Sequence, residues 1–234
     1  MTIGIISAMD SEQRKLVERL QDKNMSGDGN LHYVEGLLGG NRVILTQCGI
    51  GKVNAAVGAT ELIRRFAPDC VISTGVAGGI DTCLRVTDVV VSERLVYHDV
   101  WCGNEYEYGQ MAEMPAVYEG CVSLLEHALS LNGTGLESYI HSGLICTGDQ
   151  FITNRTELDA IKQRFPDGLA VDMESVAIAQ TCYLYNTPFL SFRIISDTPW
   201  VDDHASQYAD FWGTMAERSF LTIWTFLSTL PSNL

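Results

Sequence analysis

Three acidic residues, Glu12, Glu174 and Asp197, each follow an apolar segment that is predicted to be a strand. These segments are 3–7, 168–172 and 188–195. In a sheet of mostly parallel strands, ligands gather beyond the carboxyl ends of the strands, so the three carboxyl groups could meet at one place although they are far apart in the sequence. Carboxyl groups that share a cleft can give a proton to a bound molecule or take one from it.

Each of these positions also has a simpler explanation. Glu12 and Glu174 lie near the predicted starts of helices, where a carboxylate gains roughly 0.3–1 kcal/mol from the helix dipole. Asp197 could cap a turn or a helix. Position alone therefore does not establish a site.

The elements that must position these residues alternate between strand and helix along the chain. Further strands are predicted at 70–74, 86–91 and 140–147, and helices at 9–22, 52–66, 118–131, 155–164, 174–185 and 208–229. The runs 31–38 and 41–47 meet at Gly39-Gly40 and indicate a hairpin, whereas residues 97–115 are irregular and aromatic. Because no linker divides this alternation, we expect one domain over residues 1–234, a three-layer α/β/α fold around a central mixed, twisted β-sheet.

The composition excludes several classes of protein. The chain has 15 basic and 29 acidic residues and a net charge of −14, whereas nucleic-acid-binding proteins cluster lysine and arginine. The seven cysteines are scattered without a CxxC pair, which argues against a disulfide framework or a zinc site and is typical of a cytoplasmic protein. The first residues lack the pattern of a secretory signal, and no apolar run reaches the roughly 18 residues that span a bilayer. We therefore expect a cytoplasmic protein that works without metal, cofactor, membrane or nucleic acid.

Short motifs surround the three carboxylates in a fixed order. They are GIISAM at 4–9, GIGKVNAA at 49–56, TGVAGG at 74–79, TGDQFI at 147–152, VDMES at 171–175 and RIISD at 193–197. In this order and spacing they closely resemble the 5′-methylthioadenosine/S-adenosylhomocysteine nucleosidases of the purine nucleoside phosphorylase superfamily, over about residues 3 to 229. The resemblance implies a nucleoside phosphorylase-like fold. It also implies hydrolysis of the N-glycosidic bond of both nucleosides, a methionine-salvage reaction that releases adenine and a 5-thioribose product.

The resemblance also implies roles for the acidic residues and their neighbours. Asp197, with Ser196 beside it, would protonate N7 of adenine, and Glu12 would orient and deprotonate the attacking water. Glu174 and Met173 would hold the ribose hydroxyls. Arg193 would help to hold the water and the carboxylates around it.

The remaining pocket residues are also assigned by the resemblance. Phe151 would stack on adenine, although an ordinary core phenylalanine is the simpler interpretation, and Ile152 would offer backbone groups to the base edge. The apolar side that receives the 5′-thio substituent would consist of Ala8, Met9 and Ile50. The Gly-rich segment Gly75–Gly79 contains no phosphate-binding motif, so we interpret it as a turn whose backbone at Val76, Ala77 and Gly78 approaches the nucleoside closely.

The chain departs from the family pattern at several positions. Val76 stands where the family usually has serine, and Asp172, another predicted binding residue, replaces a usual glutamate. Tyr208 is either an aromatic lid residue or an ordinary residue at a helix start. His204 lies near Asp197 in the sequence and could be a second proton donor. An exposed loop histidine is the simpler interpretation.

Three alternatives stay open beside this function. The first is a sister hydrolase acting on futalosine or 5′-deoxyadenosine, the second a purine nucleoside phosphorylase, and the third a nucleoside-binding domain without catalysis. The loop 8–12 holds two carboxylates and no cation precedes Arg14, which favours water over phosphate as the nucleophile. The resemblance further implies a homodimer with segment 97–118 at its interface.

Overall fold

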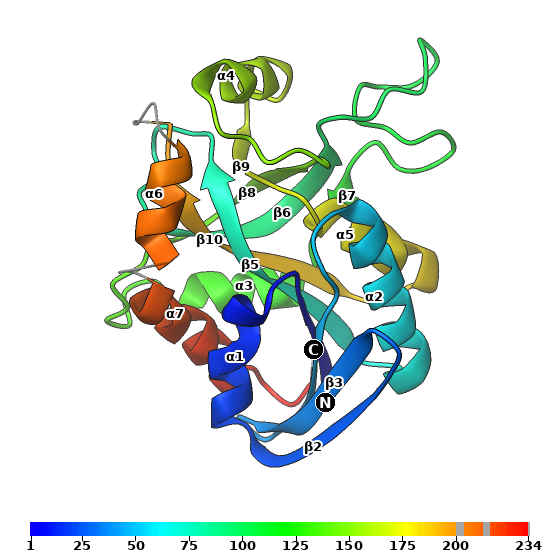
Figure 1. Ribbon diagram of the computed structural model, residues 1–234, viewed down its shortest axis with the longest axis vertical. Helices are drawn as coiled ribbons and strands as arrows, with labels where there is room; N and C mark the ends of the chain where they lie inside the picture. Colours follow the sequence, from blue (N-terminus) through cyan, green and yellow to red (C-terminus); the bar gives the residue numbers. More distant parts are fainter. Residues whose placement is uncertain (200–203, 213–215, 234) are drawn as a thin grey trace.

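The computed structural model describes residues 1–199, 204–212 and 216–233, and within them a single mixed sheet of ten strands forms the centre of the fold (Figure 1). The strands are β1 (Thr2–Ser7), β2 (Gln21–Asp28), β3 (Leu31–Leu38), β4 (Asn41–Gln47), β5 (Cys70–Gly79), β6 (Val89–Tyr97), β7 (Tyr118–Glu119), β8 (Ile140–Thr147), β9 (Gly168–Asp172) and β10 (Phe189–Asp197). The helices are α1 (Asp10–Arg19), α2 (Lys52–Phe66), α3 (Val122–Ser130), α4 (Arg155–Arg164), α5 (Ser175–Tyr185), α6 (His204–Asp210) and α7 (Ala216–Thr229).

The sheet closes on itself at β10. This strand is parallel to β5 on one side and antiparallel to β6 on the other, and β6 continues through β8 and β9 back to β5. The remaining strands β1, β4, β3 and β2 extend outward from β5. The prediction of a mixed, twisted sheet in a nucleoside phosphorylase-like fold is confirmed.

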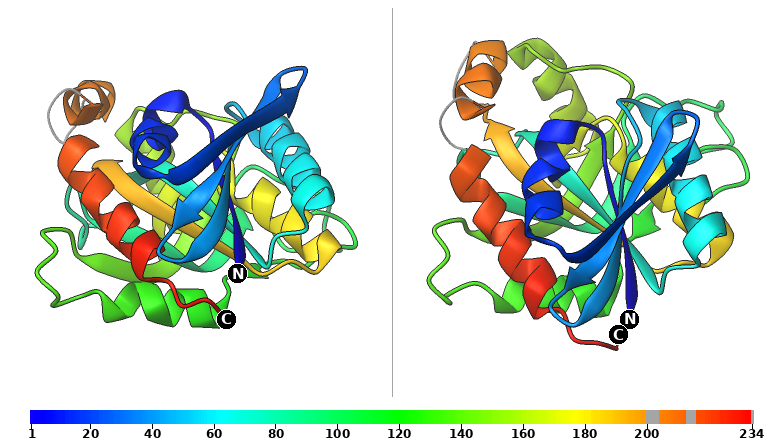
Figure 2. Two further views of the ribbon diagram at one scale, coloured as in Figure 1. Left: turned by 90° about the horizontal axis from the view of Figure 1, so that it is seen from below. Right: turned by 60° about the horizontal axis from the view of Figure 1, so that its bottom comes forward.

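Helices cover both faces of this sheet. In Figures 1 and 2, α2 and α5 lie side by side over one face, and α1, α3 and α7 lie on the other. Both faces of the sheet are apolar because successive side chains of a strand point to opposite faces, and each apolar face is covered by helices. In β1, Ile3 and Ile5 join the cluster with α1 and α7, whereas Ile6 joins the cluster with α2 and α5.

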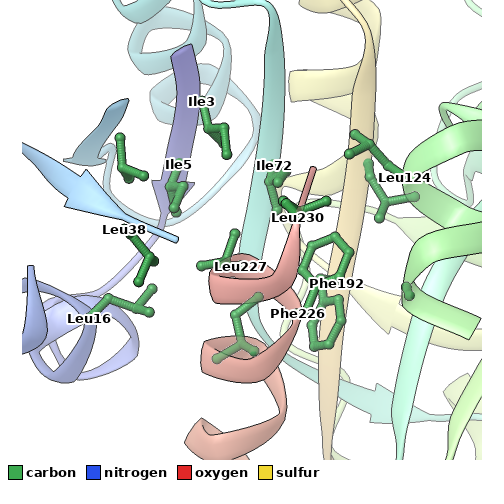
Figure 3. Close-up of a cluster of buried hydrophobic side chains, with 14 of the residues drawn as sticks. Ile3, Ile5, Leu16, Leu38, Ile72, Leu124, Phe192, Phe226, Leu227 and Leu230 are labelled. Carbon is green, nitrogen blue, oxygen red and sulfur yellow. The ribbon is translucent and has the colours of Figure 1, made fainter. Parts of the chain in front are cut away.

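The core beneath α1 and α7 is a continuous apolar cluster. Ile3 and Ile5 of β1, Ile72 of β5 and Phe192 of β10 meet Leu16, Phe226 and Leu227 from the two helices (Figure 3). The rings of Phe192 and Phe226 stack with their centroids 5.0 Å apart. This packing holds β1, which precedes Glu12, and β10, which ends at Asp197. Among the described residues, the helices are too short or too polar to cross a membrane.

Strand β2 corrects the predicted helix 9–22. Helix α1 ends at Arg19, and the polar run Gln21–Asp28 pairs with β3 at the edge of the sheet. Residues 21–27 are all exposed. Because an exposed edge strand needs no apolar face, its sequence lacks the alternation by which strands are recognised.

The expected turn at Gly75–Gly79 is also wrong. Strand β5 continues through this segment, with Gly75–Gly78 paired to β10 and Gly78 and Gly79 paired to β9. Since the segment forms ladder hydrogen bonds with β10 along Gly75–Gly78 and with β9 at Gly78 and Gly79, its glycines stay extended. Gly78 consequently lies between Asp197 of β10 and Val171 of β9.

Three other predicted elements differ from the structure by more than two residues. Helix α3 begins at Val122 and not at 118, because Tyr118 and Glu119 pair with β6 as β7. The strand predicted at 86–91 is β6, Val89–Tyr97. The single helix predicted at 208–229 corresponds to α6 and α7, and residues 213–215 lie outside the described residues.

Candidate active site

A cavity of about 360 Å³ opens where the carboxyl ends of β1, β5, β9 and β10 meet. Every site residue predicted from the sequence lines it, except Arg193. The lining residues are Ala8, Met9, Glu12, Ile50, Val76, Ala77, Gly78, Gln150, Phe151, Ile152, Val171, Asp172, Met173, Glu174, Ser196, Asp197 and Tyr208. The three carboxylates Glu12, Glu174 and Asp197 therefore share one cleft.

Glu12 is held by backbone donors at the start of α1. One carboxylate oxygen accepts the N–H groups of Ala8 at 3.0 Å and Met9 at 2.9 Å, and the other accepts the N–H of Val76 at 3.1 Å. The bond to Met9 caps α1 at its N-terminus, so the simpler explanation for Glu12, placement at a helix start, is correct in part. Burial of the carboxyl group nevertheless raises the pKa of Glu12, although nearby Arg193 and these three bonds lower it. A base of raised pKa suits proton abstraction from water.

Arg193 lies behind the cavity wall rather than in it. Its side chain is 1% exposed, and its Nε lies 2.7 Å from Asp172 Oδ2 and 3.0 Å from Ser175 Oγ. Its Nη2 donates to Ser73 Oγ at 2.8 Å. Burial lowers the pKa of Arg193, but the three surrounding carboxylates more than offset this effect and keep it charged.

Asp172 has a structural explanation that the sequence did not give. Its carboxylate accepts the backbone N–H of Ser175 and the hydroxyls of Ser175 and Thr147, besides pairing with Arg193. The side chain thus satisfies donors at the N-terminus of α5 and anchors the buried guanidinium. Asp172 is therefore a support of the cavity wall as well as part of its lining.

Glu174 is the residue before α5 and is 6% exposed. Its Oε1 accepts the N–H of Gly51 at 2.8 Å, and Gly51 adopts a φ of 93° at the start of α2. Burial raises the pKa of Glu174 to about 7, with Arg193 opposing and Asp172 adding to this rise. The carboxylate is thus a hydrogen-bond acceptor fixed in a desolvated wall.

Asp197 ends β10 and faces the other side of the cavity. Ser196 Oγ lies 2.8 Å from Asp197 Oδ1 and 3.2 Å from the carbonyl oxygen of Ala77. A Cβ placed on Gly78 would come within 3.1 Å of Asp197 Oδ2, so the absence of a side chain there keeps the carboxyl group open to the cavity. Asp197 is 5% exposed.

Two aromatic rings close the outer side of the cavity. Phe151 is 53% exposed, and its ring meets that of Tyr208 edge to face, with centroids 5.3 Å apart and an interplanar angle of 69°. The hydroxyl of Tyr208 lies 4.0 Å from Met9 Sδ across the opening. An ordinary core phenylalanine would be buried, so the exposed ring of Phe151 is suited to stacking on a planar ligand.

The Gly-rich segment was expected to bring its backbone close to the nucleoside. At Gly75 the backbone instead lies close to two side chains. A Cβ at this position would lie 2.4 Å from Arg193 Nη1 and 2.5 Å from Glu12 Oε1. The guanidinium and the carboxylate therefore pack against the bare backbone of β5.

Two lining residues, Gln150 and Val171, were not predicted. Each lies next to a predicted residue, in the motifs at 147–152 and 171–175. A prediction that included every residue of these motifs would have contained both. The side chain of His204 lies outside the described residues. Among the residues that the structure does describe, there is no group of three or more His, Cys, Asp or Glu placed to hold a metal ion.

Comparison with known proteins identifies the family. Residues 2–228 match the model of the Phosphorylase superfamily. The 5′-methylthioadenosine/S-adenosylhomocysteine nucleosidase of Oceanobacillus iheyensis is 43% identical over 84% of this chain and 86% of its own, and that of Tolumonas auensis is 38% identical over 98% and 100%.

Solved structures agree with the sequence comparison. The Neisseria meningitidis nucleosidase in complex with methylthio-immucillin-A has a TM-score of 0.91 at 36% identity, covering 98% of this chain and 99% of its own. The Colwellia psychrerythraea nucleosidase in complex with adenine has a TM-score of 0.92 at 35% identity, covering 100% and 97%. The chain thus belongs to the 5′-methylthioadenosine/S-adenosylhomocysteine nucleosidase family of the Phosphorylase superfamily.

Proposed function

We propose that this chain hydrolyses the N-glycosidic bond of 5′-methylthioadenosine and S-adenosylhomocysteine and releases adenine and the 5-thioribose product. The observation that carries the proposal is the convergence of Glu12, Glu174 and Asp197 on one cavity of about 360 Å³. The relatives are named for these two nucleosides, and two of the solved neighbours hold methylthio-immucillin-A and adenine.

Asp197 is the proposed general acid. An adenine anion is a poor leaving group, so its departure needs a proton at N7. In this proposal the bond between C1′ and N9 breaks with its electron pair moving into the purine, and Asp197 delivers its proton to N7. The hydroxyl of Ser196, 2.8 Å from Oδ1, helps to orient the carboxyl group.

Glu12 is the proposed general base. A water held by Glu12 attacks C1′, and its proton passes to the carboxylate. After the products leave, Glu12 releases its proton to solvent and Asp197 takes up a proton from solvent. The three backbone donors fix the direction of the Glu12 carboxylate.

Glu174 and Phe151 are the proposed binding contacts for the two halves of the nucleoside. Glu174, assisted by Met173, accepts hydrogen bonds from the ribose hydroxyls. Phe151 stacks on adenine, a contact that contributes about 1–3 kcal/mol per base in nucleic-acid-binding proteins. Ile152 offers backbone groups to the base, and Ala8, Met9 and Ile50 receive the 5′-thio substituent.

Phosphorolysis is less compatible with this charge arrangement. A phosphate nucleophile needs an available cation, but Arg193 is already paired with Asp172 at 2.7 Å behind the wall. A phosphate that approached C1′ beside Glu12 would meet a carboxylate instead. Water carries no charge and avoids this repulsion.

We also propose that the chain acts as a homodimer that buries exposed apolar side chains of α2, α5 and segment 97–118. Val53 and Val57 of α2 are 75% and 52% exposed, and Leu184 of α5 is 57% exposed. Trp101, within segment 97–118, is 55% exposed. A second copy seated on α2, α5 and segment 97–118 would cover these side chains and complete the 5′ side of the cavity.

We further propose that the reaction takes place in the cytoplasm. All seven cysteines are unpaired, and Cys83 is exposed. Free thiols are typical of proteins in reducing compartments.

The direct test is a panel of 5′-substituted adenosines in phosphate-free buffer, with adenine release as the readout. We expect turnover of both thio-nucleosides, and futalosine and 5′-deoxyadenosine in the same panel separate the sister activities.

Asp197→Asn and Glu12→Gln should each lower kcat by about 10²–10⁴-fold, the usual contribution of a general acid or base. Asp10→Asn, which removes an exposed carboxylate from the same turn as Glu12, is the matched control and should retain native rates. Native-rate adenine release by Asp197→Asn would disprove the assignment of the acid.

A further inference from the structure

A cluster of charged groups at the outer rim of the cavity is not used by the proposed chemistry. Lys52 at the start of α2 lies between Asp99, which follows β6, and Asp149, which follows β8. Its Nζ is 2.9 Å from both carboxylate oxygens of Asp99 and 3.7 Å from Asp149 Oδ2. The ammonium also lies 5.2 Å from the centroid of the Tyr97 ring.

Backbone groups tie the same three segments together. The N–H of Lys52 donates to Asp149 Oδ1 at 2.8 Å, and the N–H of Asp149 donates to Asp99 Oδ2 at 2.9 Å. The loops after β4, β6 and β8 are therefore joined in a closed set of hydrogen bonds. The side chains of Lys52 and Asp99 are each 22% exposed, which distinguishes this pair from the fully solvated ion pairs that contribute little.

Each end of this cluster adjoins a binding contact of the cavity. On one side, Gly51 precedes Lys52 and donates its N–H to Glu174 Oε1. On the other side, Phe151 lies two residues after Asp149 and lines the cavity. A Cβ on Gly51 would come within 3.1 Å of Asp149 Oδ1, so the two segments are in direct contact.

We infer that Lys52 is a positioning residue. By pairing with Asp99, it holds two segments in place: Gly51, which binds the Glu174 carboxylate, and Asp149, which precedes Phe151. This role rests on the proposed function for the identity of the ligand. Lys52 does not line the cavity, so it acts through the main chain of two loops. Loss of the ammonium should therefore loosen both loops at once.

The kinetic signature of such a role differs from that of a merely structural one. Glu174 and Phe151 hold the nucleoside in the ground state and in the transition state alike, so their misplacement weakens uniform binding and raises KM while kcat is kept. A residue that only stabilises the fold would lower the active fraction and hence kcat, with KM unchanged. The split between the two parameters separates these cases.

The test compares Lys52→Met with Lys52→Arg and Lys162→Met. Lys162 also pairs with one carboxylate, Asp81 at 2.5 Å, and has a similar exposure of 28%, but it does not line the cavity. For Lys52→Met we expect KM for 5′-methylthioadenosine to rise roughly ten- to hundredfold, the scale of a weakened base-stacking contact, with kcat within about threefold of native. Lys52→Arg should recover most of the native KM, and Lys162→Met should leave both parameters unchanged.

Amide hydrogen exchange of the protein without ligand gives a second readout that does not depend on catalysis. In Lys52→Met, segments 48–54 and 147–153 should both exchange faster, whereas the hairpin 31–47 should keep its native rate. Acceleration of only one loop, of neither, or of the hairpin as well would overturn the inference. If Lys52→Met does not fold, Asp99→Asn removes the same ion pair and should give the same pattern. Failure of the native protein to release adenine would contradict the proposed function but leave the exchange result intact.

Discussion

At the scale of single residues, the cavity concentrates negative charge. Glu12, Glu174 and Asp172 surround one guanidinium, that of Arg193, which pairs with Asp172. The carboxylates thus outnumber the cation around the place where ribose would lie. Hydrolysis of an N-glycoside passes through a sugar that carries positive charge, and Glu12, the carboxylate proposed to act at C1′, is the preorganised negative group that stabilises this state. The same field opposes an anionic nucleophile.

The raised pKa of Glu174 predicts a dependence of stability on pH. Burial raises this pKa from 4.5 to about 7. The folded chain therefore binds the proton more tightly than the unfolded chain, and this group makes the free energy of unfolding fall as the pH rises from 4.5 to 7. Glu174→Gln removes the titration. We expect it to be more stable than the native protein at pH 8 by about 1–3 kcal/mol, and equally stable near pH 4.

Urea denaturation at both pH values measures this difference. Glu18→Gln, which changes an exposed glutamate of α1, should show no such pH-dependent gain. The interpretation would be wrong if Glu174→Gln had the same offset from native at pH 4 and at pH 8. The same variant should bind ribose poorly, because an amide is a weaker acceptor than a carboxylate.

Gly75 predicts a severe loss of activity on a small substitution. An added Cβ would stand 2.4 Å from Arg193 Nη1 and 2.5 Å from Glu12 Oε1, distances at which both groups must move. We expect Gly75→Ala to lower kcat at least about a hundredfold, since small displacements of catalytic groups have effects of this size. Steady-state kinetics on folded protein, verified by circular dichroism, would measure it. A native kcat would show that Glu12 does not need its observed position.

Most residues that line the cavity could be predicted from the sequence, but the contacts that hold the cavity wall could not. The strand-end positions of Glu12, Glu174 and Asp197 follow from apolar runs that precede them, and these residues do line one cavity. Asp172 could not be interpreted from its sequence, because its partners Thr147 and Arg193 come from other strands. Contacts between distant strands depend on the topology of the sheet, which local patterns do not reveal.

At the scale of elements, α4 is a further support of the cavity because it begins just after Phe151 and Ile152. Asn154 is its N-cap, and the side chain accepts the N–H of Glu157 at 3.0 Å. We expect Asn154→Ala to lower the free energy of unfolding by about 1 kcal/mol, the usual contribution of such a cap. Asn154→Asp keeps an acceptor and should remain near native. Denaturant titration tests both variants, and an unchanged midpoint for Asn154→Ala would contradict the prediction.

The elements that the sequence predicted well have clear boundaries. Helix α4 has the bounds predicted, 155–164, since its cap Asn154 marks the start, and β8 is predicted correctly as 140–147. Strand β2 was missed because its polar side chains face solvent, and the end of β5 was taken for a turn because glycine weakens the signal of a strand. In both cases pairing with neighbours, and not local propensity, decides the structure.

At the scale of the whole molecule, the exposed apolar face on α2 and α5 predicts the state of assembly. We expect the native protein to sediment at twice the chain mass of 25.8 kDa. Val57→Glu places a charge in the proposed interface and should shift the population to monomers at micromolar concentration, because a buried unpaired charge is costly. Leu221→Glu changes a side chain of equal exposure, 52%, on α7 and should remain dimeric. Sedimentation of the native chain as a monomer would refute the proposed dimer.

Closure of the sheet by β10 bears on how the protein emerges during translation. This strand enters between β5 and β6 and brings Arg193, Ser196 and Asp197 with it. A ribosome-bound chain that ends before residue 189 therefore has two unpaired strand edges, which are templates for association with other chains. It also lacks the proposed acid. Nascent chains should consequently need protection by chaperones until late in synthesis, and they should be unable to hydrolyse nucleosides until that last strand has docked.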